Sequence, residues 1–129
     1  MAQQPIELIL VRHLASLLTT PIFVVDVNGD LVYFNEPAEE VLGIRFVDVS
    51  MRYEDWTTAF RVSQDGVTLP EEEIPLAFAL RQGKPWLGQV DIMDGEGRWR
   101  RIDVSAFPIT GRQEEILGAV AMFWERPPD

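Results

Sequence analysis

The sequence contains no cysteine and a single histidine, His13, among its 129 residues. The absence of cysteine excludes disulfides, thiolate nucleophiles, and the zinc and iron–sulfur sites that cysteine thiolates hold. One histidine leaves little room for a histidine-based metal site or a catalytic triad. The chain therefore lacks most of the residues from which reactive centres are usually built.

Positive charge and long apolar runs are also scarce. Eleven Lys and Arg residues stand against 21 Asp and Glu residues, which gives a net charge of −10. Nucleic acid and anionic membrane surfaces are poor partners for such a chain because they are negative themselves. The apolar run at residues 8–11 is too short to cross a bilayer, and no signal peptide is visible. We therefore expect a cytoplasmic protein that binds neither nucleic acid nor membrane.

The composition that remains is that of a globular chain, with 47% hydrophobic and 25% charged residues, and the length suits one domain. Residues 5–19 are predicted to form an amphipathic helix with two neighbouring apolar stripes. The first stripe consists of Ile6, Ile9, Leu10, Leu14 and Leu17. The second stripe consists of Leu8, Val11, Ala15 and Leu18. Together they make an apolar face that is wider than one packing contact needs.

A hairpin and a short helix are predicted next. Residues 22–27 and 31–34 are apolar and β-branched, and Asn28-Gly29 between them suits a tight turn. Asn35 then precedes a helix over residues 36–42 as its N-cap, and Gly43 ends that helix in the left-handed region. Asp26 is predicted to cap the turn amides, with a carboxyl of raised pKa as the alternative.

The rest of the chain indicates an α+β fold. Residues 44–69 are irregular, with short helical turns expected around residues 50–60, and a helix is predicted over residues 73–82. Strands follow at 86–93, 99–109 and 116–124. With the hairpin they predict a five-stranded antiparallel sheet with helices on its concave face.

The last strand is apolar on both sides, so both faces of the sheet must be covered. Val120 and Met122 lie on one side, and Ala119, Ala121 and Phe123 lie on the other. The middle helices are expected to cover the concave face. The N-terminal helix or a second copy of the chain is expected to cover the outer face.

In this order and spacing, the segments resemble the PAS domain family. Residues 21–43 are similar to the family's opening hairpin and first helix, residues 69–85 to its long helix, and residues 104–109 and 116–125 to its last two strands. The matching positions of the first segment are Asp26, Gly29, Phe34, Asn35, Ala38 and Gly43. The resemblance divides the chain into an N-terminal helix (1–20), a PAS domain (21–125) and a tail (126–129).

The resemblance implies a sensor or interaction module in signal transduction and not an enzyme. Such a module holds a small molecule, or nothing, between the sheet and its helices. By the same resemblance, the inward-facing residues either line an apolar pocket or fill the core without a cavity. They are Phe23, Val25, Val32, Phe34, Ala38, Val41, Leu42, Ile102, Val104, Val120 and Met122.

Several cofactors of the family can be weighed against the sequence. The light-sensing branch with a cysteinyl-flavin and the branch with a thioester-linked chromophore both need a cysteine, which is absent here. The haem-binding branch usually takes its iron ligand from a histidine on the long helix, and residues 73–82 contain none. Non-covalent flavin, a fatty acid or no ligand at all remain as alternatives.

The family often dimerises through an N-terminal helix, and the wide apolar face of residues 5–19 predicts a parallel homodimer through the first stripe, Ile6 to Leu17. Pro127-Pro128 does not suit the signalling helix that usually follows the last strand in the family. The chain is therefore expected to be either a stand-alone module or a part of a longer protein, and a signalling effector protein is the partner that the resemblance implies. Two alternatives remain. One is a small cone-shaped α+β enzyme of the isomerase kind with Asp26 or Asp103 as its base, and the other is a purely structural dimerisation module.

Overall fold

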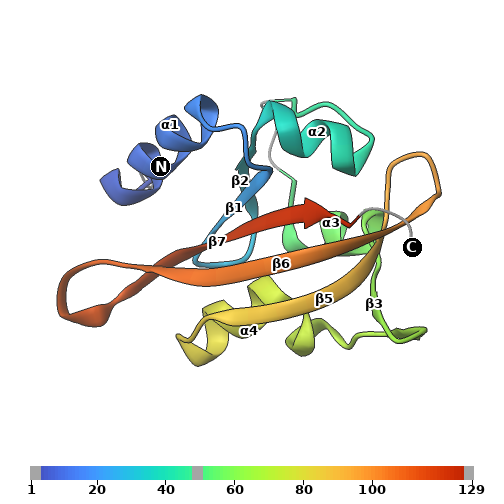
Figure 1. Ribbon diagram of the computed structural model, residues 1–129. Coiled ribbons are helices and arrows are strands. Elements are labelled where there is room, and N and C mark those ends of the chain that lie inside the picture. Colours follow the sequence, from blue (N-terminus) through green and yellow to red (C-terminus); the bar gives the residue numbers. More distant parts are fainter. Residues whose placement is uncertain (1–3, 48–50, 127–129) are drawn as a thin grey trace.

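The computed structural model describes residues 4–47 and 51–126, and residues 127–129 of the predicted tail lie outside them (Figure 1). Its helices are α1 (Ile6–Leu17), α2 (Glu36–Leu42), α3 (Tyr53–Ala59) and α4 (Pro75–Gln82), with single 3₁₀ turns η1 (Glu71–Glu73) and η2 (Arg112–Glu114). Its strands are β1 (Ile22–Asp26), β2 (Leu31–Phe34), β3 (Val62–Gln64), β4 (Val67–Thr68), β5 (Trp86–Met93), β6 (Trp99–Thr110) and β7 (Ile116–Glu125). Within the described residues, no helix has the length and apolar character needed to span a bilayer.

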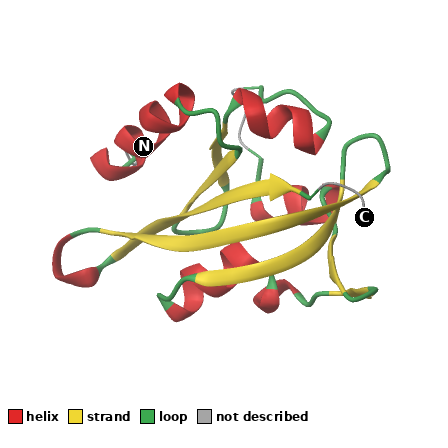
Figure 2. Ribbon diagram, viewed as in Figure 1, coloured by secondary structure: helices red, strands yellow, loops and turns green. Residues whose placement is uncertain are grey.

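The strands form one antiparallel sheet in the order β2-β1-β7-β6-β5-β3-β4 (Figure 2). The sheet therefore has seven strands, and the prediction of five was wrong. The five predicted strands are present, and β3 and β4 add a small hairpin beside β5. These two strands are three and two residues long, too short to show an alternating pattern in the sequence. Only their turn, Asp65-Gly66, carries a sequence signal, and both residues have positive φ angles.

The two faces of the sheet pack against different helices, because successive side chains of a strand point to opposite faces. The inner face belongs to a large buried cluster that also includes residues of α2, α3 and α4. The outer face belongs to a smaller buried cluster that includes Leu8 and Ala15 of α1. Figure 1 shows α1 and α4 on opposite sides of the long strands β6 and β7.

Strand β7 has the opposite phase from the one predicted. Val120 and Met122, expected to point inward, belong to the outer cluster, and Ala119, Ala121 and Phe123 belong to the inner one. The phase is set by pairing with β1, where Ala121 lies opposite Phe23 and Val120 lies opposite Val24. Because both sides of β7 are apolar, its own sequence contains no sign of this choice.

Val32 is the third inward prediction that was wrong, and a β-bulge is the cause. The pairing of β1 with β2 shifts between Val24 and Val25, so that Val25 lies opposite Leu31 and Val24 lies opposite Tyr33. Val32 is the extra residue of this bulge, and it packs in the outer cluster. A bulge reverses the alternation of the strand that carries it, which a simple parity argument does not anticipate.

Candidate functional site

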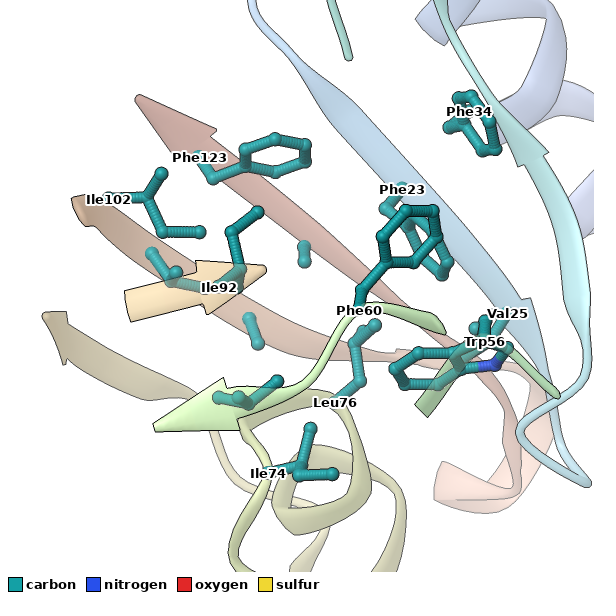
Figure 3. Packing of buried hydrophobic residues seen from close by; sticks show 14 of the residues in the cluster. Phe23, Val25, Phe34, Trp56, Phe60, Ile74, Leu76, Ile92, Ile102 and Phe123 are labelled. Atoms are coloured by element: carbon teal, nitrogen blue, oxygen red, sulfur yellow. The ribbon is translucent and has the colours of Figure 1, made fainter. Parts of the chain in front are cut away.

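A cavity of about 70 Å³ lies within the inner cluster, between the sheet and helices α3 and α4 (Figure 3). Its walls come from both layers, with Phe23, Ile102 and Phe123 on the sheet and Trp56 and Leu76 on the helices. The remaining lining residues are Leu42, Phe60, Val62, Ile74, Pro75, Val90, Ile92, Val104 and Ala121. Every one of these side chains is apolar except for the indole N–H of Trp56.

That N–H is already bonded, since Trp56 Nε1 donates to the carbonyl oxygen of Gly29 at 2.8 Å. The Trp56 ring also packs edge-on against Phe23 with a centroid distance of 5.2 Å, and Phe23 stacks on Phe34 at 5.7 Å. The cavity therefore offers a bound molecule dispersion contacts and no hydrogen bonds. Its chemistry selects small apolar molecules and disfavours any ligand with polar atoms.

The predicted lining residues divide into three groups. Phe23, Leu42, Ile102 and Val104 line the cavity. Four others lie in the same buried cluster without lining the cavity, and they are Val25, Phe34, Ala38 and Val41. Val32, Val120 and Met122 lie on the other side of the sheet, in the cluster under α1.

The main walls that sequence reasoning missed come from the irregular middle of the chain and from β5. Trp56 and Phe60 lie on and just after α3, where no period could be assigned from the sequence. Val90 and Ile92 lie on β5 at alternate positions, both buried. Their spacing is a signal that could have found them, because it is the alternation of a half-buried strand.

Helix α1 carries its two stripes on opposite sides. Leu8 and Ala15 of the second stripe are almost fully buried against the sheet. The first stripe is exposed along its whole length, and its residues are Ile6, Ile9, Leu10, Leu14 and Leu17, each more than half exposed. A single chain therefore leaves a largely apolar helix face in contact with water, which is unusual for an isolated domain.

Asn35 joins α1 to the rest of the domain. Its side-chain oxygen accepts from the backbone N–H of Ala38, which caps α2, and from that of Ile22 at the start of β1. Its amide nitrogen donates to the carbonyl oxygens of Ala15 at 2.9 Å and Thr20 at 2.8 Å. Asn35 is 1% exposed, so one buried amide ties together the end of α1, the first strand and the second helix.

Two aspartates cap the turns at opposite ends of the sheet with the same geometry. Asp26 accepts from the backbone N–H groups of Asn28 and Asp30, and Asp94 accepts from those of Glu96 and Arg98, all within 3.0 Å. Burial raises the pKa of Asp26, and the amide hydrogen bonds only partly oppose that effect. Burial also raises the pKa of Asp94, but the hydrogen bonds from Arg98, Glu96 and Arg100 outweigh it and hold that pKa below its usual range.

Neither candidate base of the enzyme alternative lies at the cavity. Asp26 is occupied in its turn, and Asp103 forms an ion pair with Arg126 on a half-exposed surface, with 3.2 Å between Asp103 Oδ2 and Arg126 Nε. Neither residue contributes to the cavity wall. In the described ranges 4–47 and 51–126, no group of three acidic or histidine side chains is placed to hold a metal ion.

A family model described as a PAS domain matches residues 19–124. Solved structures have the same fold at low sequence identity. The PAS domain of a protein from Colwellia psychrerythraea aligns with a TM-score of 0.65 and 18% identity, covering 92% of this chain and 97% of that one. The PAS domain of BvgS from Bordetella pertussis aligns with a TM-score of 0.64 and 17% identity, covering 95% of this chain and 87% of that one. A LOV protein from Rhodobacter sphaeroides aligns with a TM-score of 0.74 and 13% identity, covering 95% of this chain and 69% of that one. No curated protein matches the sequence.

Proposed function

Because the chain belongs to the PAS domain family, whose members are generally sensory modules of signal transduction, we propose that it is a ligand-responsive interaction module that signals as a homodimer. The ligand is a small apolar molecule held in the inner cavity, and the output is a change in packing that reaches the dimer contact. The observation that carries this proposal is the cavity between the two layers of the domain, lined by apolar side chains from both.

The chemistry of the walls limits the ligand. A flavin carries several hydrogen-bonding atoms around its ring system, and these would lose their water partners in a cavity that offers none in return. Flavin therefore does not fit the residues present, and neither does any ligand with a charged group. A short aliphatic or aromatic hydrocarbon group suits the walls, since it gains dispersion contacts and loses little by leaving water.

Binding would shift the packing of the helices on the sheet. The interior around the cavity is close-packed, so a molecule larger than the present space must displace one wall. The walls formed by α3 and α4 are short helices flanked by turns, while the opposite walls belong to the long paired strands β6 and β7. We expect the helices to move farther than the strands, which shifts the balance between two packing arrangements.

The partner proposed for the exposed stripe of α1 is a second copy of the chain. The stripe residues are all uncharged, whereas the whole chain carries a net charge of −10. Two copies therefore meet with the least repulsion through this face. A two-fold axis along the helix pairs the same residues from both copies and removes the stripe from water.

The ligand proposal is tested with xenon as a small apolar probe and methyl NMR as the readout. We expect xenon to shift the methyl signals of Leu76, Val90 and Val104 and to leave those of Val24 and Val120 on the other face unchanged. Ala121→Leu, which fills the cavity, should abolish the shifts. The matched change Val120→Ile on the outer face should preserve them.

An absence of shifts at the cavity methyls would overturn the proposed binding site. Native mass spectrometry of protein purified from cells then identifies the cellular ligand by its mass. Recovery of only polar or charged molecules bound at this cavity would contradict the proposed ligand class.

The dimer proposal is tested by sedimentation velocity with a charge placed in the stripe. Leu10→Asp should convert the dimer to a monomer, because it buries a carboxylate in an apolar contact. The matched control is Val67→Asp on β4, an equally exposed apolar residue at the opposite edge of the sheet, and it should leave the dimer intact. A dimer that survives Leu10→Asp would contradict the proposed contact.

A further inference from the structure

The only histidine of the chain lies in the middle of the exposed stripe of α1. Ile6, Leu10, His13 and Leu17 follow one another at spacings of four, three and four residues. This is the spacing of the core positions in a parallel two-stranded coiled coil, where each residue meets its own counterpart. His13 thus occupies a core position of the proposed dimer contact and is exposed in the single chain.

The helix positions around His13 are mostly apolar. Its neighbours one helical turn away on the same side are Ile9, Leu10 and Leu17, with the hydroxyl-bearing Ser16 at the margin. Leu8 and Ala15 attach the other side of α1 to the sheet, so the strands lie across the helix from His13.

Among the residues that the structure describes, the charged groups nearest the stripe come from α2, where Glu36 and Glu40 line a surface hollow together with Ser16, and the other charged and titratable groups near α1 lie at its flank or on the sheet side. On the helix itself, Glu7 lies at its flank near Gly111, and the Arg12 guanidinium lies over the ring of Tyr33, 5.0 Å from its centroid. The strands packed against α1 contribute Asp26 of β1, Tyr33 of β2 and Glu125 of β7, and these strands lie on the sheet side of the helix.

We propose that His13 makes the dimer sensitive to pH, fixing a parallel and in-register contact while neutral and loosening it when protonated. This inference rests on the proposed dimer. A neutral imidazole has one N–H donor and one acceptor, so the two copies of His13 can satisfy each other across the two-fold axis. A polar residue at one core position also selects the register in which it meets its counterpart.

Protonation removes this pairing. Two imidazolium groups have donors only, and they repel each other where they meet at the two-fold axis. The dimer therefore binds protons at His13 less readily than the monomer does, and dimerisation weakens as pH falls through the range where histidine titrates. Because two protons must be lost for each dimer that forms, linkage allows the dissociation constant to rise by at most about 100-fold for each pH unit below that range.

The rest of the protein responds to acid in the opposite direction. The net charge of −10 becomes less negative as pH falls, which reduces the repulsion between two copies. Acid should therefore strengthen association through any contact that lacks His13. A dimer that weakens in acid therefore indicates the contribution of His13, because the change in net charge alone has the opposite effect.

The experiment is sedimentation velocity on the wild-type chain at pH 7.5 and 5.5, with circular dichroism to verify that the fold persists at both. We expect the wild-type dissociation constant to rise by one to two orders of magnitude at pH 5.5. His13→Leu should dimerise more tightly at pH 7.5 and lose this rise. His13→Gln keeps a polar group that does not titrate, and it should dimerise at both pH values without weakening in acid.

The outcomes separate this inference from the proposal on which it rests. A wild-type dimer that is equally strong or stronger at pH 5.5, or a His13→Leu variant that still weakens in acid, would overturn the role of His13 and leave the dimer intact. A chain that is monomeric at pH 7.5 at high concentration, or a dimer that survives Leu10→Asp, would overturn both.

Discussion

The two faces of the sheet are both covered by helices, but to different extents. The inner face is apolar over most of its breadth, from Phe23 on β1 to Ile92 on β5, and helices of three separate segments cover it. The buried apolar residues of the outer face gather near α1, where Ile22, Val24 and Val120 pack beneath the helix. Farther from α1, the same face carries ion pairs, in which Arg101 is bonded to Asp91 and Arg126 is bonded to Asp103.

This difference indicates how firmly each cover is held. The inner helices contribute many buried residues to one large cluster, whereas α1 contributes only Leu8 and Ala15 to the smaller one. Elements with few buried contacts open at a lower free energy than the core does. We therefore expect α1 to be the more easily displaced layer, which is also the layer that the proposed signal must reach.

The largest expected effect comes from opening the inner face. Phe34 is 2% exposed and stacks on Phe23, so Phe34→Ala leaves a void that its close-packed neighbours cannot fill. We expect the free energy of unfolding to fall by about 3–5 kcal/mol in urea denaturation. Leu87→Ala, at a residue 82% exposed on the outer face, should change it by less than about 0.5 kcal/mol. Similar losses in the two variants would contradict the contrast between the faces.

The second effect comes from cutting the connection between the two layers at Asn35. Asn35→Ala leaves buried donors and acceptors of Ile22, Ala15 and Thr20 without their partner, at a cost of about 2–3 kcal/mol. Hydrogen exchange should be accelerated most in α1, since its last turn loses the hydrogen bond from Asn35 to Ala15. Asn35→Asp keeps the acceptor and removes both donors, so it should preserve the cap of α2 and still release α1. Uniform acceleration over the whole sheet would show that Asn35 does not hold α1 in particular.

Local chemistry explains which parts of this architecture are visible in the sequence. Asn28-Gly29 indicates the first hairpin, Asn35 the start of α2 and Gly43 its end, and each of these signals acts within a few residues. The PAS resemblance rests on the same short signals in their order along the chain. The family and the five long or well-marked strands could therefore be predicted.

The features that could not be predicted depend on contacts between distant segments. The phase of β7 depends on its pairing with β1, about a hundred residues earlier, and the inward prediction of Val32 failed at a bulge opposite Val24. Asn35 was expected only to cap α2, but three of the four hydrogen bonds of its side chain reach Ala15, Thr20 and Ile22. The cavity walls at Trp56 and Phe60 likewise come from a segment without periodicity.

A smaller effect is expected from adding a side chain at Gly118, where Leu8 of α1 packs against the sheet. A Cβ atom at Gly118 would lie 2.9 Å from Cδ2 of Leu8 and would also meet the carbonyl oxygen of Val25. Gly118→Ala should therefore push Leu8 away from the sheet and cost about 1–3 kcal/mol. The double variant Leu8→Ala/Gly118→Ala removes one of the two clashes, so its loss should be smaller than the sum of the single losses. Strict additivity would show that Leu8 and Gly118 do not interact.

The smallest expected effect is a difference in pKa between the two capping aspartates. Their turns have the same geometry but lie toward opposite faces of the sheet. Alternation along β1 places Asp26 on the outer face, while Asp94 follows β5 toward the inner face and bonds to Arg100, 3.0 Å from its Nε. Burial raises the pKa of Asp26 and the neighbouring carboxylate of Asp30 adds to that, whereas the hydrogen bonds to Asp94 overcome burial and lower its pKa. Carbon-detected NMR titration should show Asp26 protonating at a higher pH than Asp94.

These opposite shifts imply opposite effects of pH on stability. The pKa of Asp94 is lower in the folded chain, so its contribution is present above the unfolded value near 3.9 and is lost as pH falls through the folded value. The pKa of Asp26 is higher in the folded chain, so its contribution is present below the unfolded value and is lost as pH rises through the folded one. Asp94→Asn should therefore flatten the loss of stability in acid, and Asp26→Asn should steepen it. A change in the same direction in both variants would contradict this prediction. It would show that the turns of Asp26 and Asp94 respond alike to acid, so that the contrast between the two faces of the sheet does not include the turns.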